Sequence, residues 1–224
     1  MLLNNVRTAV FIGAHTDDEM ICAGTLRKLI NTGTEVHVIA CSFARTKNDP
    51  PEVSKKILKR EFASAMEILG VPEERRWLLD LETRNLPQQR EIIRQSVYDF
   101  VEKNHPDIAF VLSPNDDHQD HQVVGEESER VMKGRVGSVI RCQYPWNYKM
   151  FHPNLYVLLS EEEIQAKLKL IGAYQSQMFR YDYVDLFRSF ARADALSIKE
   201  NAAGAEKFEI LRSVIPITKK GGTI

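Results

Sequence analysis

Two short segments of this sequence are unusually rich in side chains that can bind a metal ion. They cover residues 13–19 (GAHTDDE) and residues 113–121 (SPNDDHQDH). Histidine nitrogens combined with carboxylate oxygens suit zinc, and three protein ligands plus a water are typical of a catalytic rather than a structural site. We therefore treat the two segments as candidates for one catalytic metal centre. Their candidate functional residues are His15, Asp17, Asp18, His118, Asp120 and His121.

The spacing within each segment supports this interpretation. His15 and Asp18 are three residues apart, as are His118 and His121. On a turn that enters a helix, residues i and i+3 lie on one face, so either pair can bind one ion. A fourth protein ligand would close the site. Asp17 points elsewhere, and it can accept a proton from the attacking water.

Each segment also has a purely structural interpretation. The acidic run 17–19 can place negative charge at a helix N-terminus, with one Asp as the N-cap. Residues 113–121 can form a polar loop that ends in a helix cap. Two His/Asp clusters after corresponding strands are harder to explain in this way, so we favour the metal site. The remaining histidines have no such neighbours, and we interpret them as structural: His37, His105 and His152.

The elements that position these segments alternate between strands and helices. Strands are expected over 8–14, 35–43, 77–81 and 107–113, and helices over 18–31, 52–69 and 87–103. Nearly continuous apolar strands separated by helices predict right-handed βαβ crossovers and a mainly parallel sheet that is covered on both faces. In an open α/β sheet, ligands bind outside the carboxyl ends of the strands. The two segments follow the first and fourth strands, so both are expected at this edge.

The pattern becomes looser after Gly134. Strands are expected over 139–144 and 155–159, helices over 161–173 and 205–215, and an aromatic amphipathic segment over 181–192. The sequence contains no Ser/Gly-rich linker and no internal repeat. We therefore predict one domain over residues 1–224, in which the C-terminal strands and helices extend the sheet.

The composition excludes several classes of protein. Thirty Lys+Arg and 31 Asp+Glu give a net charge of −1, which argues against a strongly basic nucleic-acid binder. No apolar stretch approaches the ~18 residues of a membrane helix, and the N-terminus lacks the features of a secretion signal. The cysteines are few, odd in number and far apart, so we expect packing residues in the reducing cytoplasm. They are Cys22, Cys41 and Cys142.

At these motifs the sequence resembles a known family. Residues 14–19 (AHTDDE) are similar to the A-H-P-D-D-E signature of the LmbE/PIG-L zinc-dependent N-deacetylases, and residues 118–121 (HQDH) resemble the second signature, H-x-D-H. Weaker similarity extends over nearly the whole chain. The resemblance implies a Rossmann-like α/β fold and an enzyme that removes acetyl groups from amino sugars and related amides. One departure is Thr16, where the family usually has a proline.

The resemblance also implies a role for each candidate residue. Asp17 would be the general base. His118, in its protonated form, would stabilise the oxyanion or protonate the leaving amine, and Asp120 would orient His118. Zinc is the expected cofactor, although affinity order alone does not exclude another divalent transition metal. The implied metal ligands are His15, Asp18 and His121.

The sequence gives weaker signals for the residues that bind the substrate than for those that bind the metal. Arg45, in the loop after the second strand, and Arg141, near a strand end, are candidates, although arginines more often form surface ion pairs. The aromatic residues around Pro145 can stack on a sugar or form a packed corner; they are Tyr144, Trp146 and Tyr148. Our leading hypothesis is a cytoplasmic zinc-dependent hydrolase that cleaves an N-acetyl group from a small amino sugar or sugar conjugate.

Two alternatives stay open. One is a metal-dependent amidase that acts on a non-sugar N-acyl substrate. The other is a non-enzymatic metal-binding or receiver-like module, because paired acids after a first strand hold magnesium in receiver domains. The histidines of residues 118–121 and the length of the chain argue against the second. We expect a small-molecule partner and neither nucleic acid nor membrane, and the sequence leaves a homo-oligomer open.

Overall fold

The structure is a computed structural model that describes residue 3 and residues 6–147 and 150–214. Its centre is a seven-stranded sheet with the order β3-β2-β1-β4-β5-β7-β6. The first five strands in sequence are parallel: β1 (Thr8–Gly13), β2 (Glu35–Ser42), β3 (Arg76–Leu81), β4 (Ile108–Leu112) and β5 (Ser138–Cys142). The strand β7 (Gly204–Ser213) runs antiparallel between β5 and β6 (Leu155–Leu159).

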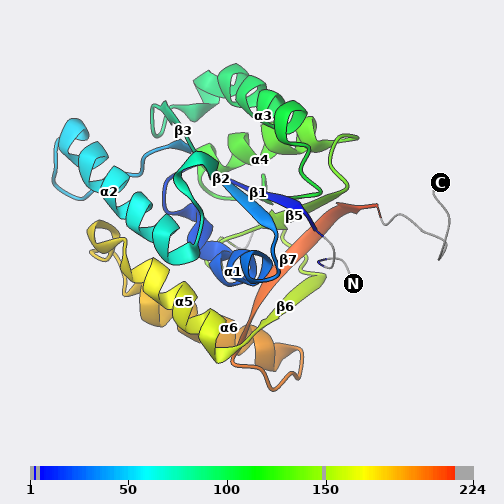
Figure 1. Ribbon diagram of the computed structural model, residues 1–224. Helices are drawn as coiled ribbons and strands as arrows, with labels where there is room; N and C mark the ends of the chain where they lie inside the picture. The colour runs from blue at the N-terminus through cyan, green and yellow to red at the C-terminus, as the bar shows by residue number, and fades with distance from the viewer. Residues whose placement is uncertain (1–2, 4–5, 148–149, 215–224) are drawn as a thin grey trace.

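Helices cover both faces of this sheet (Figure 1). They are α1 (Ala23–Asn31), α2 (Pro51–Leu69), α3 (Arg90–Asn104), α4 (Gln119–Met132), α5 (Glu161–Gly172) and α6 (Tyr183–Ser197). On one face α3 packs against α4, and on the other α1 and α2 pack against α5, which in turn contacts α6. This arrangement confirms the predicted Rossmann-like α/β fold with a C-terminal extension.

Local sequence explains the elements near the site. The strand β1 is buried from Ala9 to Gly13 because helices cover both of its faces, which accounts for its continuous apolar run. The helix α2 begins with Pro51, whose fixed φ suits the first helical position. It ends at Gly70, which has a φ of 93° and closes the helix in the left-handed conformation.

The closing helix predicted over 205–215 is wrong. Residues 204–213 form β7, and Ile215 lies outside the described residues. The segment is rich in good helix formers, but pairing with two neighbouring strands overrides this local preference. Phe208 and Glu206 are buried while Lys207 between them is partly exposed, the alternation of a strand. The helix α4, which begins within the second metal-binding segment, was not predicted from the sequence.

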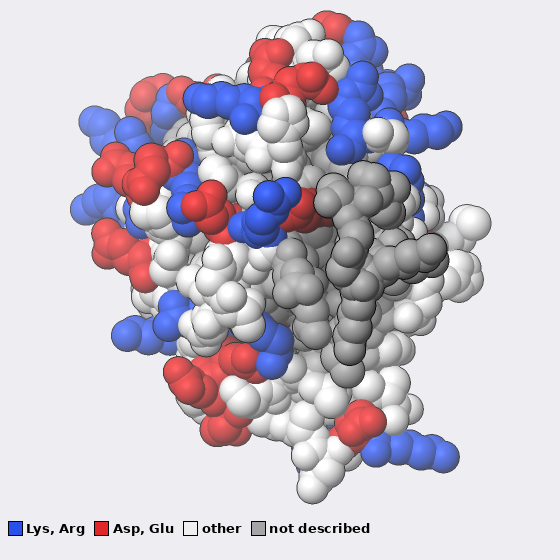
Figure 2. All heavy atoms as spheres, turned by 45° about the vertical axis from the view of Figure 1, so that its right-hand side comes forward, with Lys and Arg blue, Asp and Glu red and all other residues white. Residues whose placement is uncertain are grey.

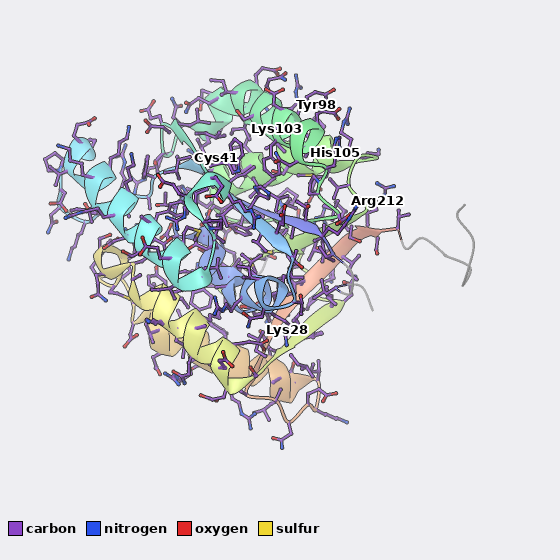
Figure 3. All side chains as sticks on the ribbon, in the orientation of Figure 1. Lys28, Cys41, Tyr98, Lys103, His105 and Arg212 are labelled. Carbon is purple, nitrogen blue, oxygen red and sulfur yellow. The ribbon has the colours of Figure 1, made fainter. Side chains whose placement is uncertain are left out.

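The surface and the interior agree with the composition. Acidic and basic side chains are both distributed over the face in Figure 2, as expected for a nearly neutral chain. Cys41 lies on β2 in the interior and His105 at the end of α3 (Figure 3). All three cysteines are free and buried. Among the described residues, no helix is both long enough and apolar enough to cross a membrane.

Candidate metal centre and active site

The two metal-binding segments meet because the strands that precede them are neighbours. Strands β1 and β4 pair in parallel, with Phe11 opposite Phe110, so their carboxyl ends lie at the same edge of the sheet. This places the ring of His15 with its centroid 5.3 Å from that of His121. His118 stacks on His121 at 4.9 Å. The fold therefore brings together residues that are about a hundred positions apart, as the sequence predicted.

Three buried residues at this edge form a group that can hold a metal ion: His15, Asp18 and His121. One donor atom from each lies within 4.8 Å of the others. The Nε2 atom of His121 is 3.3 Å from Oδ1 of Asp18. Two tetrahedral zinc ligands with bonds of about 2.0–2.1 Å would be about 3.4 Å apart. The donor set and its spacing therefore fit a divalent ion such as zinc.

The carboxylate of Asp18 is fixed by its own turn. Its Oδ2 accepts hydrogen bonds from the backbone N–H groups of Ala14 at 2.7 Å and His15 at 2.8 Å. Its Oδ1 accepts one from the hydroxyl of Tyr144 at 3.1 Å. Burial raises the pKa of Asp18, but His121 and His15 outweigh it and hold the pKa well below its usual range. Asp18 is therefore an ionised, oriented carboxylate that can act as a ligand, and Tyr144, which the sequence left between a sugar-stacking residue and a packed corner, contacts it.

Carboxylates also lie behind both histidine ligands. Oδ2 of Asp116 is 3.2 Å from Nδ1 of His121, and Oδ2 of Asp120 is 3.2 Å from Nε2 of His15. Such outer carboxylates fix the orientation of a metal-binding imidazole and increase its basicity. Sequence reasoning missed Asp116, because adjacent acids in a polar loop do not show which one faces inward.

These acids give the site a surplus of negative charge. Burial lowers the pKa of His15, but Asp120 and Asp18 raise it to about 9. Burial likewise lowers the pKa of His121, while Asp18 and Asp116 raise it to about 10. The carboxylates thus favour positive charge at both imidazoles. A divalent cation can supply that charge in place of the two protons, because metal binding requires neutral histidines.

Asp17 differs from its neighbour Asp18. It is partly buried and lines the cavity above the three metal-binding residues. It does not cap the short helix that follows it, so the structural interpretation as an N-cap does not apply to its side chain. Burial and the negative charge of Asp18 raise the pKa of Asp17 to about 6. A carboxylate with a pKa close to neutrality is well suited to accept a proton.

His118 and Asp120 interact differently from the expectation. His118 is the N-cap of α4, and its Nδ1 accepts the backbone N–H of Asp120 at 3.2 Å. Burial and the neighbouring His15 and His121 lower the pKa of His118 to about 4. The lowered pKa and the bond at Nδ1 favour a neutral imidazole with its proton on Nε2, whereas the sequence predicted a protonated one, and the role of His118 stays a prediction. The carboxylate of Asp120 contacts His15, so Asp120 orients His118 through its backbone instead.

A cavity of about 680 Å³ opens above these residues. Arg45 lines it, as predicted from its loop, together with Trp146, which stacks on Tyr144 at 4.8 Å. Arg141 does not line it. The guanidinium of Arg141 donates to Glu129 at 2.5 and 2.8 Å, and these bonds hold it against α4. The structure thus places Arg141 in an ion pair away from the cavity, and it does not bring Arg141 together with the other predicted site residues. Tyr148 lies outside the described residues.

Comparison with known proteins identifies the family. Residues 10–132 match the PIG-L family, described as GlcNAc-PI de-N-acetylase, and the match covers more than half of the chain. The chain belongs to the PIG-L family. Membership confirms the predicted family and the predicted enzyme class, an N-deacetylase. No curated protein matches the chain.

Solved structures share the fold at low sequence identity. The N,N'-diacetylchitobiose deacetylase from Pyrococcus horikoshii is 21% identical with a TM-score of 0.76, over 94% of this chain and 85% of that one. The A40926 pseudoaglycone deacetylase Dbv21 is 15% identical with a TM-score of 0.74, over 95% and 100%. A 4-carboxy-2-hydroxymuconate hydratase from Pseudomonas putida is 16% identical with a TM-score of 0.79, over 95% and 99%. The same fold therefore carries different reactions, and the residues of the site determine which of them occurs.

The departure from the PIG-L signature, Thr16 in place of proline, lies in a turn that is held by another residue. Tyr174 is fully buried, and its hydroxyl contacts the backbone carbonyl of Thr16 and Oε1 of Glu19, the latter at 2.6 Å. The threonine hydroxyl itself has no hydrogen-bond partner among the described residues. Tyr174 therefore supplies, from the C-terminal half, a restraint on the turn that a proline would otherwise give through its ring.

Proposed function

We propose that this chain is a zinc-dependent hydrolase that removes an N-acetyl group from an amino sugar or sugar conjugate. The observation that carries the proposal is the buried group His15–Asp18–His121, with the carboxylate of Asp17 beside it at an open cavity. The names of two relatives with the same fold, a diacetylchitobiose deacetylase and a pseudoaglycone deacetylase, support the choice of substrate class. The three free, buried cysteines support the proposed cytoplasmic location.

When bound, the ion polarises the acetamide carbonyl and lowers the pKa of water towards ~7. Asp17 takes up the proton that the attacking water loses. Because the pKa of Asp17 is about 6, its carboxylate is mostly ionised at neutral pH and can act as the base. Once protonated, the same carboxyl group can return the proton to the leaving amine.

His118 donates a hydrogen bond from Nε2 to the carbonyl oxygen as negative charge develops there. The neutral imidazole is held in this tautomer because the backbone N–H of Asp120 occupies Nδ1. A neutral donor that is fixed in advance stabilises an oxyanion without needing a proton from solvent. These contacts support a role for His118 in stabilising the oxyanion, and we assign protonation of the amine to Asp17.

The cavity offers surfaces that suit a sugar. Trp146 and Tyr183 line it, with their ring centroids 5.9 Å apart, and both present aromatic area to the opening. Its volume lies in the range of pockets that bind small molecules, which is ~300–1,000 Å³. A small amino sugar or the acetylated end of a larger conjugate would fit such a site.

The test combines metal content with acetate release. Purified, chelator-free protein is analysed by mass spectrometry, and acetate is measured with N-acetylglucosamine, N,N'-diacetylchitobiose and N-acetyl amino acids. We expect about one zinc per chain and activity on the sugars. His121→Ala should lose both metal and activity, because it removes a ligand. His152→Ala, at an exposed histidine in a loop, is the matched control and should keep both.

Two outcomes would contradict the proposal. Wild-type protein that binds no divalent ion after reconstitution at neutral pH would exclude the metal-dependent mechanism. Acetate release from N-acetyl amino acids without release from either sugar would favour the non-sugar amidase.

A further inference from the structure

Three arginines surround the cavity from three different loops. Arg45 follows β2, Arg84 follows β3 and Arg180 precedes α6, and all three line the cavity and are exposed. Within the described part of the chain, none of their guanidinium groups is paired with a carboxylate. By contrast, Arg90 and Arg141 are each bonded to glutamates. Unpaired arginines at a cavity are well suited to bind an anion, because the planar guanidinium matches carboxylate and phosphate geometry.

Arg84 is the most firmly positioned of the three. Its φ is 69°, a left-handed conformation that residues other than glycine adopt rarely. Its N–H donates to Oδ2 of Asp120 at 2.6 Å, and its carbonyl accepts from the side chain of Gln119. The same oxygen of Asp120 lies 3.2 Å from Nε2 of His15. Such strain persists where the surroundings fix the backbone, and it is frequent at functional sites. The backbone of Arg84 is therefore tied to the metal-binding residues while its side chain lines the cavity.

Charged residues line the cavity at two depths. We call the part next to His15, Asp18 and His121 its floor, and the part lined by exposed side chains its opening. The floor carries the carboxylates of Asp17 and Asp18, whose charge a bound divalent ion would offset, while the exposed Asp117 lines the cavity nearer the surface. The three arginines add positive charge at the opening. A substrate whose amide reaches the floor would therefore meet the arginines with its far end. Electrostatic complementarity favours a negative group at that end.

We propose that Arg84, together with Arg45 and Arg180, binds an anionic substituent of the substrate, a carboxylate or a phosphate. The inference rests on the proposed function, because it assigns the end of the N-acyl substrate that is remote from the amide. It predicts that the enzyme selects acidic amino sugars or acidic sugar conjugates over neutral ones.

The test measures binding separately from hydrolysis. Glucosamine, glucosamine 6-phosphate and muramic acid, which carries a carboxylate, contain no acetyl group and are not hydrolysed. Isothermal titration calorimetry of the metal-loaded protein should show that at least one acidic sugar binds about tenfold more tightly than glucosamine, the effect of a charge-assisted hydrogen bond. The preference should weaken as salt is raised. Whether the phosphate or the carboxylate is preferred identifies the natural group.

Arg84→Gln should remove most of this preference and leave the affinity for glucosamine unchanged. Glutamine also carries a Cβ, so the backbone at φ 69° is no more strained than with arginine. Arg188→Gln is the matched control, because Arg188 is exposed on α6 and does not line the cavity. Metal content and melting temperature verify that both variants are folded.

Equal affinity for neutral and acidic sugars in the wild type would overturn the inference, and so would a preference that survives in Arg84→Gln. The two proposals fail separately. Acetate release from neutral and acidic N-acetyl sugars at equal kcat/KM would keep the hydrolase and overturn the anion site. An anion preference in calorimetry without acetate release from any sugar would keep the anion site and overturn the hydrolase.

Discussion

The two parts of this chain contribute different things to one site. Residues 10–132, the part that matches the PIG-L family, supply all three members of the buried metal-binding group and the candidate base. The part after residue 132 supplies the aromatic wall of the cavity, including Tyr144 and Trp146, together with Arg180. The chemistry thus lies at the ends of adjacent parallel strands, where the backbone is fixed by the sheet. The opening of the cavity draws on both parts, because Arg45 and Arg84 from the first part line it together with Trp146 and Arg180.

The two parts of the site also differ in how deeply their residues are buried. Asp18 is 2% exposed and accepts three hydrogen bonds, whereas Trp146 is 39% exposed and Tyr181 is 63% exposed. Residues in a closed network resist replacement, because removing one leaves a buried charge unpaired. Exposed residues on the cavity wall tolerate replacement, because their side chains are not part of such a network. We therefore expect variants of the floor to change metal binding or turnover, and variants of the wall to change substrate affinity.

The largest effect expected, beyond loss of a metal ligand, is that of Asp17→Asn. Asparagine keeps the shape of the side chain but cannot accept the proton of the attacking water. We expect kcat to fall by about 10²–10⁴, the usual contribution of a general base. Metal content should stay at the wild-type level, because Asp17 is not a member of the buried metal-binding group. Steady-state kinetics and mass spectrometry check the two parts, and near-normal turnover would show that another group is the base.

A smaller effect is expected from Asp116→Asn, which removes the negative charge behind His121. Replacement of such outer carboxylates typically weakens metal affinity by about 10–100-fold. Turnover at saturating metal should stay near the wild-type value, because Asp116 does not line the cavity. Competition with a chromophoric chelator measures the metal Kd. Asp117→Asn, at the adjacent residue on the cavity, is the matched control. Equal loss of metal affinity in both variants would argue against the role of Asp116.

The sequence predicted that the two His/Asp segments would meet, because the determinants of this arrangement are local. The run 8–14 and the run 107–113 are apolar strands, and each ends in a cluster of histidines and acids. Parallel pairing then brings the clusters together without further information. The sequence could not distinguish Asp116 from Asp117, since the inward residue depends on how the loop turns. The charge of His118 was likewise inaccessible, because it depends on neighbouring imidazoles and on one backbone N–H.

The part of the chain after residue 132 was harder to predict, because hydrogen-bonded pairing between strands that are distant in sequence determines its structure. The segment over β7 has a composition typical of a helix, and only its position between two strands makes it a strand. Arg141 and Arg84 show the same limit for side chains. Arg141 was a candidate by its place near a strand end, yet glutamates from α4 and β7 bind it. Arg84 was not singled out, because a left-handed backbone held by Asp120 leaves no pattern in the sequence.

The smallest effect expected is that of Trp146→Ala on the wall. Trp146 stacks on Tyr144 and faces the cavity, so its removal takes away aromatic surface that a sugar ring can contact. An aromatic contact of this kind contributes about 0.5–1.5 kcal/mol, which corresponds to a rise in KM of roughly twofold to tenfold. Metal content and kcat should not change, because Trp146 is not a member of the buried metal-binding group and stacks on Tyr144, which in turn donates to Asp18. A loss of metal comparable to that of Asp116→Asn would mean that the wall helps to hold the floor, and the division between the two parts would fail. Unchanged KM for every sugar, with unchanged metal content, would instead place the substrate away from Trp146, nearer the loops that carry Arg45 and Arg84.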